Sequence, residues 1–212
     1  MAPLGVLIAD LRFQCPFGMY VSGPIISGKS SLIFNLINNA ELHFYPVPQR
    51  IVYDHAVWQD RFLSVKNVEF TTDLESVLQN DYFDKSVNNL LVLDDVMSDI
   101  SRNKKAADLF TRGIHHNNIS VVFISQNLYK QGPSMRDIVL NCQYLILFEN
   151  TRDVTQLLHL RRQLGIKHLV EAYGKAIKEP YGHLMVDLKP RTDHRLKLQS
   201  NISGRRVIYV QK

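Results

Sequence analysis

Short apolar runs alternate along this chain with longer segments in which apolar side chains recur every three or four positions. The runs are rich in β-branched residues, as is typical of strands buried on both faces, whereas the longer segments have the period of helices that pack on a sheet. This alternation predicts an α/β fold with a mostly parallel central sheet flanked by helices. The expected strands are residues 19–22, 50–54, 90–94, 120–125 and 144–148, with a weaker one at 68–71.

The segments between and after these strands predict amphipathic helices. The first carries an apolar face and ends near Asn38 and Asn39, and after the strand at 144–148 Asp153 is a candidate helix cap. From Pro180 onward, residues 183–187 and 206–209 have the pattern of short strands. The sequence between them is basic and polar, with Lys189, Arg191, Arg195 and Lys197. We therefore expect one domain over residues 1–212, in which 180–212 is a basic, β-rich extension.

Composition and charge narrow the possible partners only a little. The net charge of +5 and the pI near 9.2 permit attraction to nucleic acid without establishing it. No apolar run reaches the length that spans a bilayer, and the first residues lack the pattern of a secretory signal, so we expect an intracellular protein without a membrane segment. Cys15 and Cys142 have no metal-ligand spacing and are expected to be packing residues.

The strongest chemical signal is a phosphate-binding loop. Residues 23–30 read Gly-Pro-Ile-Ile-Ser-Gly-Lys-Ser and match the pattern GxxxxGK[ST] completely. The loop follows an apolar strand and opens an amphipathic helix, whose backbone N–H groups and positive dipole end face an anion. A plain glycine turn is the alternative. We assign ATP binding to Gly23, Pro24, Ile25, Ile26, Ser27, Gly28, Lys29, Ser30 and Ser31, with Lys29 also acting on the terminal phosphates.

Polar residues that follow two later strands complete the expected site. The apolar run 90–93 ends in Asp94 and Asp95 at the strand edge where α/β proteins bind ligands. Asp94 is expected to hold Mg²⁺ opposite the Ser30 hydroxyl, and Asp95 to orient and deprotonate the attacking water. Gln126, after the strand at 120–125, is a candidate sensor of the γ-phosphate. The alternatives are an acidic loop start for the two carboxylates and a turn former for Gln126.

With these residues in place, the chain resembles the FtsK/HerA-type ATPases, and especially the genome-packaging ATPases of double-stranded DNA viruses and Polinton-like (Maverick) elements. The likeness covers most of the chain. It rests on the phosphate loop, Val57-Trp58-Gln59, the LLVLDD run at 90–95, the stretch 109–132, Asn150-Thr151-Arg152-Asp153 and Leu160-Arg161-Arg162-Gln163. It implies a P-loop NTPase fold of the RecA/ASCE-like class.

The resemblance also implies a function and partners. Its members form homo-oligomeric rings, bind ATP between subunits and drive double-stranded DNA into a preformed capsid, so capsid proteins and DNA are the implied partners. The chain is then the product of a virus or virus-like element, acting in the host nucleus or cytoplasm. Arg152 is a candidate arginine finger that acts in the next subunit, with Arg136 and Arg161 as alternatives. Asp95 stands where many relatives carry Glu, which is one methylene longer.

Two other classes of function are compatible with a phosphate loop. A small-molecule or nucleoside kinase could use Arg161 and Arg162 as a lid over the transferred phosphate. Two features favour the DNA-moving ATPase over the kinase, because kinase chemistry needs neither of them. One is the strand expected between Lys29 and Asp94, and the other is Gln126. A binding module that uses nucleotide only as a switch is the third class.

Overall fold

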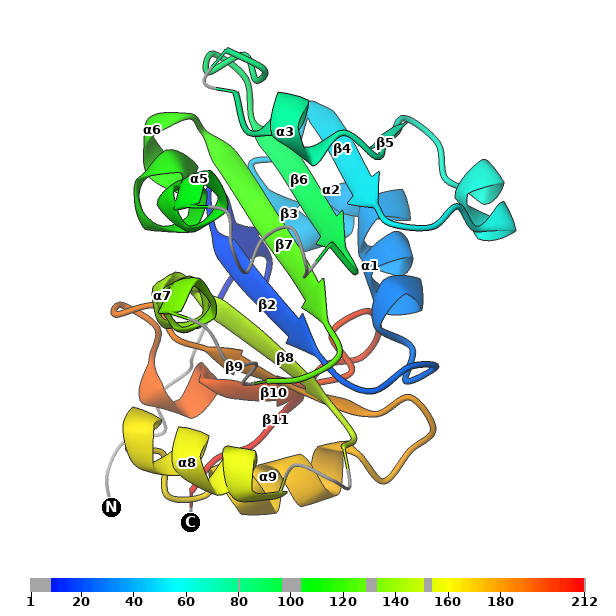
Figure 1. Cartoon of the computed structure of the whole chain (residues 1–212). Coiled ribbons are helices and arrows are strands. Elements are labelled where there is room, and N and C mark those ends of the chain that lie inside the picture. Colours follow the sequence, from blue (N-terminus) through cyan, green and yellow to red (C-terminus); the bar gives the residue numbers. More distant parts are fainter. Residues whose placement is uncertain (1–8, 80, 97–103, 129–132, 151–153, 212) are drawn as a thin grey trace.

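A nine-stranded sheet forms the centre of the molecule (Figure 1). The computed structural model describes residues 9–79, 81–96, 104–128, 133–150 and 154–211. The strand order is β11-β10-β9-β8-β2-β7-β6-β4-β5. The strands are β2 (Gly18–Ser22), β4 (Arg50–His55), β5 (Glu69–Thr71), β6 (Asn89–Asp94), β7 (Ile119–Ser125), β8 (Tyr144–Phe148), β9 (His183–Asp187), β10 (Leu198–Ser200) and β11 (Val207–Ile208).

The six strands from β8 to β5 are all parallel, and β9, β10 and β11 continue the sheet in antiparallel pairing. This confirms the predicted α/β class and the mostly parallel sheet. A separate parallel pair joins β1 (Phe13–Gln14) to β3 (Phe44–Tyr45). The expected strand at 206–209 is reduced to β11, and β10 was not predicted.

Helices cover both faces of the sheet because successive strand residues point to opposite sides. In β6, Leu91 and Leu93 pack in one apolar cluster, whereas Leu90 and Val92 pack in the other with α1. Figure 1 shows α1 and α2 behind the sheet and α5, α7 and α8 in front of it. No described helix is long and apolar enough to span a bilayer.

Helices connect many of the strands. The α-helices are α1 (Lys29–Asn38), α2 (Ala40–His43), α3 (Leu74–Val77), α5 (Lys104–Asp108), α6 (Ile114–His116), α7 (Pro133–Asn141), α8 (Val154–Leu164) and α9 (Leu169–Ala176). A π-helical turn covers Leu109–Gly113, and 3-10 turns cover Asp60–Ser64 and His194–Leu196. The candidate cap Asp153 lies outside the described residues.

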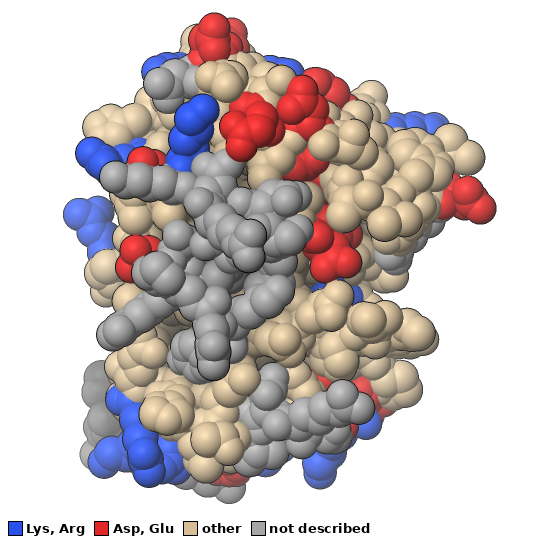
Figure 2. All heavy atoms as spheres, viewed as in Figure 1, with Lys and Arg blue, Asp and Glu red and all other residues tan. Residues whose placement is uncertain are grey.

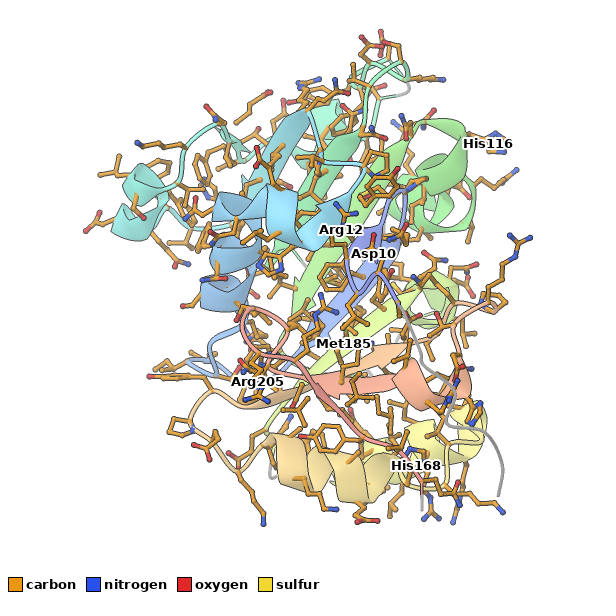
Figure 3. The ribbon with its side chains drawn as sticks, turned by 180° about the vertical axis from the view of Figure 1, so that it is seen from behind. Asp10, Arg12, His116, His168, Met185 and Arg205 are labelled. Atoms are coloured by element: carbon orange, nitrogen blue, oxygen red, sulfur yellow. The ribbon has the colours of Figure 1, made fainter. Side chains whose placement is uncertain are left out.

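The C-terminal segment packs back onto the rest of the chain. Leu198 of β10 is fully buried in the cluster in front of the sheet, and Ile202 joins the cluster that contains α1. Figure 3 shows Arg205 on the loop between β10 and β11, near the start of α1, and Asp10 with Arg12 on the N-terminal segment. The Arg12 side chain donates to both carboxylate oxygens of Asp10.

Replacing Leu198 with Ala tests our proposal that residues 180–212 fold as part of one domain. Because Leu198 is fully buried, we expect the free energy of unfolding to fall by about 2 to 5 kcal/mol in urea titrations, with one cooperative transition. Val210→Ala is the control, since Val210 is 54% exposed, and it should change this free energy by less than about 0.5 kcal/mol. A separate early transition of the extension would contradict the proposal.

Candidate functional site

The predicted site residues converge at one edge of the sheet. The strands β2, β7 and β6 are neighbours, and their carboxyl ends lie at the same edge (Figure 1). The phosphate loop leaves β2 there, and its path is fixed by Gly23, whose N–H donates to the Ser125 carbonyl at 3.2 Å. A Cβ on Gly23 would lie 2.6 Å from Cβ of Phe148, so only glycine fits this position.

The loop turns into α1 through a left-handed glycine. Gly28 has φ 97° and its carbonyl accepts the N–H of Leu32 at 2.9 Å, which is the first helical hydrogen bond. Ile26 also lies in the left-handed region, with φ 66°, and its side chain is 86% exposed. The first N–H groups of a helix have no partner within that helix. The start of α1 is therefore built to receive an anion.

Lys29 lies folded against its own loop. Its Nζ donates to the carbonyl oxygens of Gly23 and Pro24, each at 2.7 Å. Burial lowers the pKa of Lys29, and the nearby carboxylates of Asp94 and Asp95 offset part of that effect. The loop carbonyls thus hold the ammonium group against the loop.

Asp94 is a buried carboxylate with two hydroxyl donors on the same oxygen. Its Oδ2 accepts from Oγ of Ser30 at 2.9 Å and from the hydroxyl of Tyr53 at 2.6 Å. The first contact brings together the two residues predicted to hold a metal. The second was missed, because an aromatic residue within the buried strand β4 has the sequence pattern of an ordinary core residue.

Asp95 and Gln126 face each other across the ends of β6 and β7. The Gln126 amide donates to Oδ1 of Asp95 at 3.3 Å. Asp95 is exposed and has φ 58°, a left-handed conformation that Asp adopts more readily than most residues. The backbone thus turns just after Asp94, so the two neighbouring carboxylates point into different surroundings, one buried and one open.

His55 is a further polar residue at this edge that the sequence did not single out. It pairs in register with Asp94 and packs against the ring of Phe62 at a centroid distance of 4.8 Å. Burial lowers its pKa, and Asp94 offsets part of this shift. Among the described residues its buried Nδ1 has no hydrogen-bond partner.

A cleft in two parts flanks the phosphate loop. The smaller part, about 170 Å³, is lined by Lys29, Ser30, His55, Asp94, Asp95 and Gln126 among others. The larger part, about 950 Å³, lies on the β8 side and is lined by residues of the phosphate loop, Gln126, Asn150 and Tyr181. Lys29 is the only lysine or arginine among the described residues that line either part.

Of the arginines proposed to act in a neighbouring subunit, only Arg161 has a described side chain. Arg152 and the side chain of Arg136 lie outside the part of the chain that is described. Arg161 lies in α8 and lines neither part of the cleft. Their roles stay predictions.

Charge is unevenly distributed on the face that carries the front helices. Figure 2 shows lysine and arginine side chains gathered over α5 and over α8, with acidic side chains over α3 and near the end of β6. In the basic extension, Lys189 pairs with Asp187 at 3.6 Å and Arg195 pairs with Asp193 at 2.7 Å. These pairs offset part of the positive charge of the extension.

Comparisons with known proteins match the fold, whereas no family model and no curated protein matches the sequence. The genome packaging NTPase B204 from Sulfolobus turreted icosahedral virus 2, in complex with sulfate, matches with a TM-score of 0.62 at 15% identity, over 87% of this chain and 95% of that chain. The chain has the fold of a P-loop ATPase. This confirms the expected resemblance to genome-packaging ATPases at the level of the fold.

Two further solved structures support the same fold. The DNA-packaging ATPase B204 from Sulfolobus turreted icosahedral virus has a TM-score of 0.60 at 15% identity, over 87% of this chain and 97% of that chain. The flagellar accessory protein FlaH from Methanocaldococcus jannaschii has a TM-score of 0.50 at 13% identity, over 93% and 92%. B204 from Sulfolobus turreted icosahedral virus 2 has also been solved with ATP-gammaS and with AMP.

Proposed function

We propose that this protein hydrolyses ATP and uses the reaction to move double-stranded DNA into the capsid of a virus or virus-like element. The observation that carries the nucleotide half of the proposal is the phosphate loop, with Ser30 hydrogen-bonded to Asp94 at 2.9 Å beside it. The DNA half is supported by the shared fold of B204, which is described as a genome-packaging ATPase.

In this proposal, the loop and α1 bind the triphosphate. Backbone N–H groups of residues 23–31 surround the phosphates, as the pattern of the loop requires. Lys29 leaves the carbonyl oxygens of Gly23 and Pro24 and turns its ammonium group to the terminal phosphates. The Lys29 ammonium group thus exchanges neutral carbonyl acceptors for negatively charged phosphate oxygens, which attract it more strongly.

Ser30 and Asp94 fit a magnesium ion. A hydroxyl and a carboxylate are the hard oxygen ligands that Mg²⁺ prefers, and here they already lie within hydrogen-bond distance of each other. When bound, Mg²⁺ neutralises charge on the phosphate oxygens. Tyr53 acts as a positioning residue in this proposal, because its hydroxyl holds the Asp94 carboxylate from the β4 side.

Asp95 and Gln126 act on the attacking water. The exposed Asp95 carboxylate accepts a proton from the water as the water oxygen bonds to the terminal phosphorus. The bond from that phosphorus to the bridging oxygen breaks, and ADP leaves with the electron pair. The Gln126 amide holds that carboxylate at 3.3 Å and lies between the two parts of the cleft, where it can also contact the terminal phosphate.

We propose that a ring of subunits supplies a second positive charge to the cleft. Lys29 is the only lysine or arginine among the described lining residues, and hydrolysis of a triphosphate develops negative charge that a second cation stabilises. We propose that an arginine of a neighbouring subunit supplies it, with Arg152 as the candidate. ATP turnover then depends on assembly.

The central test is ATP turnover by the purified chain with and without duplex DNA, run beside a sizing experiment. We expect an oligomeric fraction whose turnover rises when DNA is added. Lys29→Ala should lower turnover by about a hundredfold or more, because it removes the cation of the phosphate site. Lys85→Ala, at an exposed position, is the control and should behave as the wild type.

The same experiment separates the alternative functions. Phosphate transfer to a small molecule by a monomer that ignores DNA would favour a kinase. Slow turnover that DNA does not change would favour a nucleotide switch. Near-normal turnover of Lys29→Ala would remove the phosphate site itself.

Asp95→Asn tests the water-activating role. We expect turnover to fall by about a hundredfold or more while ATP binding persists, because the amide cannot accept the proton. Trapped ATP can be measured by filter binding with labelled nucleotide. Glu149→Gln makes the same change at another exposed acid of the cleft and should leave turnover within about twofold. If both variants behave alike, the base lies elsewhere.

Tyr53→Phe tests whether Tyr53 positions the metal ligand. We expect the magnesium concentration that gives half-maximal turnover to rise about tenfold, because the Asp94 carboxylate loses a hydroxyl donor at 2.6 Å. Tyr20→Phe is the matched control: it removes a similar buried hydroxyl, which donates to the Asn127 carbonyl at 2.7 Å. An equal magnesium response in the two variants would contradict the role of Tyr53.

A further inference from the structure

An exposed aromatic side chain lies against the phosphate loop from the other end of the chain. Tyr181, in the loop between α9 and β9, is 68% exposed. A Cβ placed on Gly28 would lie 3.0 to 3.4 Å from carbon atoms of Tyr181, which include two ring carbons. In Figure 1 this loop and the phosphate loop lie side by side at the same edge of the sheet.

The backbone holds Tyr181 in this place. Tyr181 has φ 59°, a left-handed conformation that costs free energy for a residue with a large side chain. The next residue, Gly182, donates its N–H to the Glu179 carbonyl at 2.8 Å. A Cβ on Gly182 would lie 2.4 Å from the carbonyl oxygen of Ala176, so glycine is required there. An unfavourable conformation kept in an ordered loop next to a ligand site is a mark of function.

Tyr181 lines the larger part of the cleft. This part, of about 950 Å³, is large enough for a nucleoside, and the metal-side residues Lys29 and Asp94 line only the smaller part. A nucleotide whose terminal phosphate faces Asp94 and Asp95 therefore extends away from them, past Gly28. Its base then reaches the side of the loop that Tyr181 covers.

We propose that the Tyr181 ring is the stacking surface for the base of the nucleoside triphosphate. The proposal rests on the proposed function, since it assumes that the loop holds the phosphates. Every base has an apolar π-face, and stacking on an aromatic ring contributes to affinity whatever the base. The Tyr181 hydroxyl is not needed for stacking, so phenylalanine should replace tyrosine.

The experiment compares ATP with inorganic tripolyphosphate, which lacks the base, by calorimetry on the full chain with Mg²⁺. We expect Tyr181→Ala to weaken ATP binding about tenfold or more and to leave tripolyphosphate binding unchanged. Tyr181→Phe should bind both ligands as the wild type does. Tyr45→Ala, at another exposed tyrosine that does not line the cleft, is the control.

Four results would overturn the proposal. Unchanged ATP affinity in Tyr181→Ala would remove the stacking role. An equal loss for both ligands would mean that Tyr181 supports the phosphate loop rather than the base. If the wild type binds neither ligand, the proposed phosphate site is wrong as well. If the wild type binds both ligands with equal affinity, the phosphate site stands and only the stacking surface is overturned.

Discussion

The buried carboxylate of Asp94 is the constraint on which the geometry of the site depends. A carboxyl group with 7% exposure at the end of a buried strand is costly unless hydrogen bonds compensate its lost hydration. The two hydroxyl donors come from β4, through Tyr53, and from α1, through Ser30. One oxygen atom of β6 therefore joins β4 to the helix that begins at the phosphate loop.

Lys29 shows a second form of compensation at the same edge. Its ammonium group is half-buried, and two loop carbonyls accept its hydrogen bonds at 2.7 Å. The loop therefore folds around its own cation. In the proposed function, a phosphate would replace these carbonyl oxygens as the acceptor of the Lys29 ammonium group. Lys29 is already partly buried, so its share of the desolvation cost would not be added on binding.

The sequence predicted those parts of the fold that depend on local pattern. Strands β2, β4, β6, β7 and β8 were found because each is buried on both faces and is read as an apolar run. Strand β10 was not, because its buried Gln199 is polar and is satisfied by contacts with Leu196 and Arg206 that no pattern reveals. The phosphate loop and Asp94 follow from spacing, whereas Tyr53 and Tyr181 reach the site only through the packing of distant segments.

The C-terminal extension is therefore more than a continuation of the sheet. Its first residues place Tyr181 against Gly28, and the chain runs from there directly into β9, which pairs with β8 along its whole length. Further on, Ile202 packs in the cluster that contains α1. If the base lies on Tyr181, a bound nucleotide contacts the phosphate loop and the extension together. The proposed base site would then connect the phosphate loop to the antiparallel edge of the sheet through β9.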